Sequence, residues 1–199
     1  MARRDDPVTA PRLVAIADLH LSLLALGAII AALFAGEIIM LIAPGEYLPA
    51  ARYVPVLMGG ALLGAAATVP ATHLHFREKT GFLPLVFGLA AAANLAGNLI
   101  FVPQFGAIAA AFCFAAANAV AMVLLWRVSS PRRAVPYPSW RYALMLGLAA
   151  LICLAPAFED SPLPLALRLA VAAIFGSGVI AGVALPAVRR FGSYHPLAV

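Results

Sequence analysis

Long apolar segments separated by short polar ones dominate the chain, and this pattern predicts helices that cross a membrane. A helix needs about 20 apolar residues to cross the hydrocarbon core of a bilayer. The six apolar segments long enough for this cover residues 19–42, 54–72, 82–102, 107–126, 142–158 and 169–188. We therefore expect an all-α fold, a polytopic bundle of six transmembrane helices, preceded by residues 1–18 and followed by a tail of residues 189–199.

The third and fourth predicted spans should form a hairpin. Residues 80–126 carry no charged side chain, and this stretch is too long for one helix but suits two. Pro103, Phe105 and Gly106 fall between the two halves. We expect the proline to end the first helix and the glycine to permit a tight turn.

The composition supports a membrane protein and excludes other classes. The 199 residues are 64% hydrophobic and 11% charged, with a mean hydropathy of +1.00. A soluble domain has about 45–50% apolar and about 25% charged residues. A compact water-soluble enzyme could not bury this much apolar surface, and disordered chains are charged and poor in apolar residues.

The basic residues predict the orientation of the helices, because cytoplasmic loops of membrane proteins are rich in Lys and Arg. With a cytoplasmic N-terminus, eleven of the 13 Lys and Arg residues fall on the inner side, and only Arg52 and Arg168 fall outside. Six spans then return the C-terminus to the cytoplasm. The net charge of +5 follows from this topology, and no pattern of interleaved basic and aromatic residues indicates nucleic-acid binding.

Polar residues inside the predicted spans are the candidates for a substrate pathway, since each is costly in hydrocarbon. Asn94 and Asn98 are four residues apart on the third span and should share a face, and Asn118 lies on the fourth span. They would either form hydrogen bonds between helices or line a translocation cavity. Glu37 is the one carboxylate well inside a predicted span and would reach the outer interface or bind an ion, whereas Asp18 and His20 should be solvated.

The sequence contains no motif for an enzyme, a metal site or a cofactor. His73 and His75 are two residues apart, so on a helix they point in different directions rather than toward one metal ion. Gly60 and Gly64 match the small-xxx-small spacing of closely packed membrane helices. We expect a membrane protein that is not an enzyme.

A series of motifs occurs in a characteristic order. The outer end of the first span, Ile38–Tyr47, precedes the Ala-Ala-Arg-Tyr-Val-Pro-Val-Leu stretch at residues 50–57. A basic loop at residues 77–81, the pair Asn94 and Asn98, and the hairpin at residues 102–111 follow. In this order and spacing, residues 38–129 resemble the C-terminal part of polysaccharide biosynthesis flippases. These O-antigen and exopolysaccharide exporters belong to the multidrug, oligosaccharidyl-lipid and polysaccharide exporter superfamily.

The resemblance implies transport of undecaprenyl-diphosphate-linked oligosaccharides across the bacterial inner membrane for cell-surface polysaccharide synthesis, through a cavity between two helical lobes. It also implies structural landmarks. Those in the turns are Gly45, Glu46 and Tyr47 outside, Lys79 and Gly81 inside, and Pro103, Phe105 and Gly106 in the hairpin. The expected partners are membrane lipids and the lipid-linked oligosaccharide.

The chain departs from the family in length, because such flippases have roughly twice as many spans. We therefore expect the chain to act with a separate N-terminal half of the transporter or as a homo-oligomer. Two alternatives stay open. The chain could be a fragment of a multidrug antiporter, for which Glu37 would be the coupling carboxylate. It could also be a non-transporting membrane assembly subunit or a truncated remnant.

Overall fold

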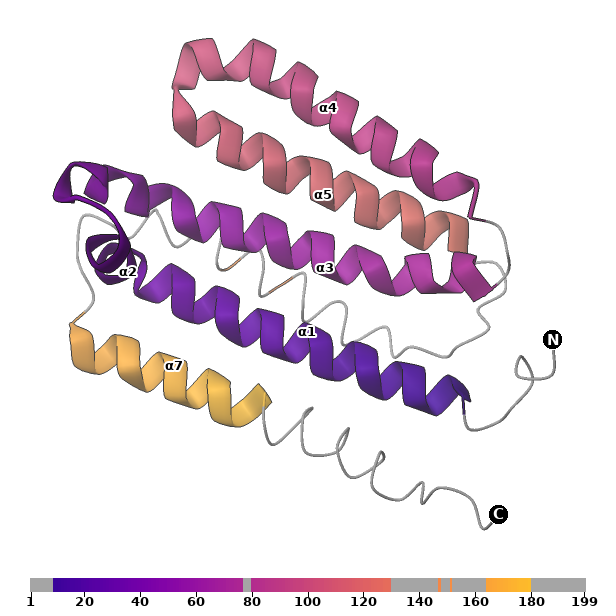
Figure 1. Ribbon diagram of the computed structural model, residues 1–199, viewed down its shortest axis with the longest axis horizontal. Helices are drawn as coiled ribbons and strands as arrows, with labels where there is room; N and C mark the ends of the chain where they lie inside the picture. Colours follow the sequence, from indigo (N-terminus) through magenta and orange to yellow (C-terminus); the bar gives the residue numbers. More distant parts are fainter. Residues whose placement is uncertain (1–8, 77–79, 130–146, 148–150, 152–163, 180–199) are drawn as a thin grey trace.

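The computed structural model describes residues 9–76, 80–129, 147, 151 and 164–179. Every secondary-structure element among these residues is a helix (Figure 1). The elements are α1 (Thr9–Leu33), α2 (Ala35–Ile42), the 3-10 helix η1 (Gly45–Tyr53), α3 (Val54–Phe76), α4 (Phe82–Phe105), α5 (Ala107–Ser129) and α7 (Leu165–Val179). Four segments in the described residues are long and apolar enough to cross a membrane: Val14–Leu33, Gly45–Thr72, Phe82–Phe105 and Ala107–Ser129. The all-helical class predicted from the sequence is confirmed for the described residues, and these four segments are consistent with the predicted membrane protein.

The long helices lie side by side in a row, in the order α4, α5, α3, α1 and α7 (Figure 1). The row does not follow the order of the chain, because the α4–α5 hairpin folds back so that α5 packs against α3. Only 11% of the membrane-length segment in α4 is buried inside the bundle. For the segment Gly45–Thr72, which contains most of α3, the buried share is 61%. Helix α4 therefore forms an edge of the row, whereas α3 lies inside it.

The centre of the row is held together by small side chains. Most of the large core cluster comes from α1, α3 and α5, and alanines such as Ala25, Ala66 and Ala121 are almost completely buried in it. Small residues let helices approach closely, which strengthens dispersion contacts where lipid removes the usual hydrophobic driving force. The packing of this Ala-rich sequence is therefore suited to a bilayer.

The first predicted span differs from the structure at both ends. The helix begins at Thr9 rather than at residue 19, and it is interrupted at Phe34, where α1 ends and the short helix α2 follows. Pro11 is tolerated because it lies in the first turn, where backbone N–H groups have no partner inside the helix. As a result, Asp18 lies within the membrane-length segment and Glu37 lies beyond the interruption.

The α4–α5 hairpin agrees with the prediction except for the role of the proline. Helix α4 continues through Pro103 and ends at Phe105. Gly106 makes the turn with a φ of 71°, a left-handed conformation that glycine adopts without strain, and its N–H donates to the carbonyl of Val102 at 2.8 Å. The glycine, not the proline, ends the helix.

The second, third and fourth predicted spans correspond to α3, α4 and α5, and each helix extends three or four residues beyond its predicted C-terminal end. The fifth predicted span, residues 142–158, lies almost entirely outside the described residues. The sixth, residues 169–188, overlaps α7, and its second half also lies outside them. The count of six helices therefore stays a prediction.

Candidate functional site

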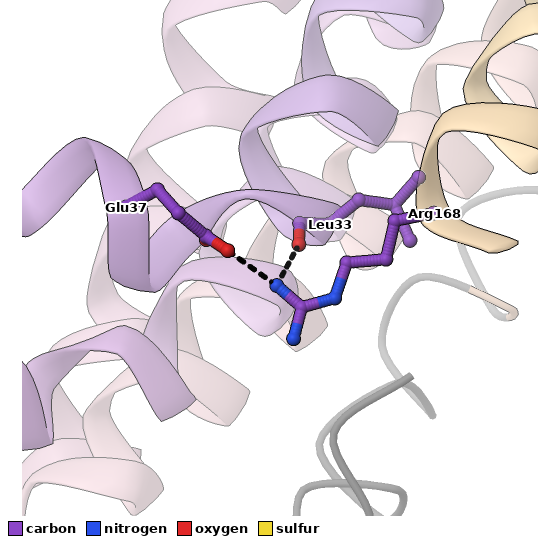
Figure 2. Close-up of polar contacts among 3 residues, drawn as sticks. All are labelled: Leu33, Glu37 and Arg168. Carbon is purple, nitrogen blue, oxygen red and sulfur yellow. Dashed lines mark hydrogen bonds and ion pairs between the residues drawn. The ribbon is translucent and has the colours of Figure 1, made fainter. Parts of the chain in front are cut away.

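An ion pair joins the interrupted first helix to α7 (Figure 2). Nη1 of Arg168 lies 2.7 Å from Oε1 of Glu37, and the same nitrogen lies 3.4 Å from the backbone carbonyl oxygen of Leu33. The Arg168 side chain is 20% exposed and the Glu37 side chain 53% exposed. One guanidinium on α7 thus contacts both the last residue of α1 and the first turn of α2.

The interruption at Phe34 explains why a cation is favourable at this place. Phe34 has φ −113° and ψ 25°, outside the helical region, and its own N–H still donates to the carbonyl of Ile30 at 3.0 Å. The last carbonyl groups of a helix carry the negative end of its dipole. Arg168 therefore neutralises both the end of α1 and the carboxylate of Glu37. We refer to Leu33, Glu37 and Arg168 as the outer clamp.

The sequence identified Glu37 as a candidate but missed Arg168. The sequence places Arg168 only as a basic residue at the outer end of the sixth predicted span. No signal in the sequence pairs it with Glu37, because Glu46, Arg52, Glu159 and Asp160 also fall at the predicted outer surface.

Asn94 and Asn98 share one face of α4, as predicted from their spacing. Nδ2 of Asn98 lies 3.5 Å from Oδ1 of Asn94, which is the outer limit of a hydrogen bond. Oδ1 of Asn98 is buried and has no hydrogen-bond partner among the described residues. A polar atom of this kind is costly in an apolar environment, so Asn98 does little to stabilise the described bundle.

Asn118 lies at a different interface from the other two asparagines. Its Nδ2 donates to the carbonyl of Phe114 at 3.0 Å within α5. Its amide also faces Gly64 of α3, where a Cβ built on the glycine would lie 2.6 Å from Oδ1 of Asn118. In the described residues, the hydrogen bonds of all three amides run within single helices rather than between helices.

Asp18 is buried rather than solvated, which corrects the expectation from the sequence. It is 8% exposed, whereas His20 is exposed as expected. The neighbouring Ser22 is also buried and donates from Oγ to the backbone carbonyl of Asp18 at 2.5 Å. The correction follows from the earlier start of α1, which places Asp18 one turn inside the membrane-length segment.

An apolar groove of about 390 Å³ lies between α4 and α5 near the Gly106 turn. Its lining residues are Phe101, Phe105, Ile108, Ala109, Phe112, Cys113 and Ala116. The lining contains no charged side chain. The groove therefore suits hydrocarbon rather than a sugar or a phosphate.

The described landmarks that the resemblance to flippases implies lie in turns and at helix ends. Gly45, Glu46 and Tyr47 are exposed in η1 beyond α2, and Gly81 directly precedes α4. Lys79 lies outside the described residues. Among the described residues, no three His, Cys, Asp or Glu side chains lie close enough together to hold a metal ion.

A scan against protein-family models, a search of curated proteins and a search of solved structures each found no match for this chain. The function must therefore be argued from the sequence and the geometry of the chain itself.

Proposed function

We propose that the chain is part of a flippase that translocates undecaprenyl-diphosphate-linked oligosaccharides across the bacterial inner membrane for cell-surface polysaccharide synthesis. Two lines support this proposal. The first is the ordered series of motifs in residues 38–129 that resembles such flippases. The second is the set of four membrane-length apolar segments in the described residues.

The observation that carries the proposal is the asymmetric burial of α4. This helix is apolar along its length, yet it packs mainly against α5 and leaves most of its surface uncovered. It also carries Asn94 and Asn98, which are half-buried and lie off its uncovered surface, and polar residues within membrane spans typically mark substrate pathways or helix contacts. The row of described helices would form one wall of the translocation cavity. We propose that a second wall comes from a separate N-terminal half of the transporter or from a second copy of the chain.

The proposed orientation places both termini in the cytoplasm. Arg127 at the end of α5 and the loop before α4 then lie at the inner surface. The outer clamp and η1, which contains Glu46 and Arg52, lie at the outer surface. This arrangement follows the excess of basic residues in cytoplasmic segments.

A multidrug antiporter fragment is the second candidate, and the burial of Asp18 favours it. Ion-coupled transporters use carboxylates within the membrane, and Asp18 is buried inside the first membrane-length segment. Glu37 suits this role less well, because its side chain is 53% exposed and it lies beyond the first membrane-length segment. Asp18→Asn should abolish ion-coupled efflux if the chain is an antiporter coupled through Asp18. Efflux that persists unchanged in this variant removes Asp18 from the coupling, and absence of ion-coupled efflux by the unaltered chain removes the antiporter candidate.

Reconstitution into proteoliposomes tests the flippase proposal. We would load one leaflet with a fluorescent undecaprenyl-diphosphate oligosaccharide and measure its appearance in the other leaflet by quenching. The chain would be tested alone, at a protein density that permits self-association, and after co-expression with a candidate N-terminal half. We expect translocation in one of the two assembled forms. Absence of translocation in both would contradict the proposal and favour a non-transporting assembly subunit or a truncated remnant.

A further inference from the structure

The α2 helix is attached to the rest of the bundle by few contacts besides the outer clamp. It is eight residues long, and Ala35 is its one buried residue. Near its C-terminal end Met40, Leu41 and Ile42 are 66%, 84% and 75% exposed. Its neighbours are η1, which follows it in the chain, and α1, from which the interruption at Phe34 separates it.

The backbone at Phe34 leaves the helical conformation at a single residue. The helical hydrogen bonds on either side are intact, since Phe34 donates to Ile30 and Ile38 donates to Phe34 at 2.9 Å. Rotation about a few dihedral angles between two intact helices is the usual form of a hinge. Helix α2 could therefore swing relative to α1 without unfolding either helix.

Arg168 contacts both sides of this junction. Its guanidinium reaches the Leu33 carbonyl on the α1 side and the Glu37 carboxylate on the α2 side (Figure 2). Arg168 itself is anchored through α7, because α7 packs along α1, where a Cβ built on Gly176 would lie 3.4 Å from Cδ1 of Leu26. Arg168 thus fixes the position of α2 relative to α1 and α7.

We propose that the junction at Phe34 is a hinge for α2, and that the Glu37–Arg168 pair is its latch, whereas η1 stays with α3 and α5, which it contacts. Opening the latch frees α2 to swing while α7 stays packed against α1. In the proposed orientation this movement occurs at the outer surface. The inference rests on the geometry of the outer clamp and not on the identity of a transported molecule, so it can fail or hold independently of the flippase proposal.

Spin-label distances measured on the full chain in lipid nanodiscs test the latch. One label pair, at Met40 on α2 and Leu167 on α7, reports on the hinge, and both positions are exposed. A second pair, at Leu23 on α1 and Ile174 on α7, reports on the packing of α7 and is also exposed. The native Cys113 and Cys153 would be replaced by alanine in all variants.

The variants are Glu37→Gln, Arg168→Gln and the double variant, with Glu46→Gln as a matched control at an exposed carboxylate of η1. Each single variant should raise the population of long 40–167 distances about two- to fivefold, the change expected for loss of one exposed ion pair. The 23–174 distances and the Glu46→Gln control should not change. The double variant should open no further than either single variant, because each substitution breaks the same Glu37–Arg168 interaction.

Three results would overturn the latch. The first is a 40–167 distribution that none of the substitutions changes. The second is additive opening in the double variant, which would show that the two residues act separately. The third is an equal change in the 23–174 distances, which would show that α7 leaves the bundle and that α2 does not swing on its own.

Discussion

Among the described residues, helix α5 packs mainly against α3 and α4, and it does so in different ways. Against α3 the backbones meet, since a Cβ built on Gly60 would lie 2.9 Å from Cα of Ala115. Against α4 the contact is through a side chain, since a Cβ built on Gly97 would lie 2.8 Å from Sγ of Cys113. The α4–α5 side also contains the apolar groove.

The two kinds of contact distinguish a rigid part of the bundle from one that can adjust. A backbone atom cannot move aside without displacing its helix, whereas a side chain can change rotamer. The α3–α5 interface is therefore the fixed centre of the row. The α4–α5 interface can adjust, which suits a helix that is proposed to face a second wall of the transporter. The four substitutions below test this comparison.

Gly60→Ala should have the largest effect. The new methyl group meets the ring of Phe114 at 2.7 Å and the backbone of Ala115, so the α3–α5 interface must open. We expect a loss of about 1–3 kcal/mol in the free energy of unfolding, measured by steric trapping in bicelles. Gly88→Ala is the matched control, since nothing lies within 4 Å of its added Cβ. It should be neutral or gain up to about 1 kcal/mol from helix propensity. Equal effects at the two glycines would contradict the close backbone contact.

Gly64→Ala should have a smaller effect, because it meets the amide of Asn118 and not a backbone atom. The amide can rotate away at the expense of its hydrogen bond to Phe114, so we expect a loss of about 1 kcal/mol. Combining it with Asn118→Ala should restore part of this loss, which a double-mutant cycle would measure. A double variant whose loss is the sum of the two single losses would show that the residues do not touch.

Gly97→Ala should change stability less than either substitution at the α3–α5 interface. The thiol of Cys113 can rotate, and α4 lies at the edge of the row where it can shift. We expect the free energy of unfolding to stay within about 1 kcal/mol of the parent, because the gain in helix propensity offsets part of the clash. A loss as large as that of Gly60→Ala would show that the α4–α5 interface is equally rigid.

Asn98→Leu should have the smallest effect on stability and the clearest effect on transport. Removing an amide whose Oδ1 has no partner in the described residues relieves a buried polar group, so stability should stay the same or rise by about 1 kcal/mol. If Asn98 lines the substrate pathway, the rate of lipid translocation should fall. Unchanged translocation together with unchanged stability would remove Asn98 from the pathway.

The sequence predicted the central helices well because their signals are local. Hydropathy located α3, α4 and α5 from their first residues, and the spacing of Gly60 and Gly64 indicated the close packing that the structure shows against α5. The shared face of Asn94 and Asn98 also followed from helix periodicity alone.

The first helix was harder to predict because its signals are not local. Asp18 looked like the polar edge of a span, but tertiary packing buries it inside α1. The interruption at Phe34 has no proline at its site. Arg168, which contacts both sides of it, lies 131 positions after Glu37 in the chain. No window of neighbouring residues contains both partners of the outer clamp.

Labelling from outside the cell tests most directly the central claim that this chain crosses the membrane as a row of helices with the α4–α5 turn outside. Single cysteines would be placed at the exposed positions Thr80 and Ala107, in a chain whose Cys113 and Cys153 are replaced by alanine. In intact spheroplasts, a membrane-impermeant maleimide should label Ala107→Cys at once and Thr80→Cys only after the membrane is permeabilised. Equal labelling of both positions before permeabilisation, or labelling of Thr80→Cys alone, would contradict the account.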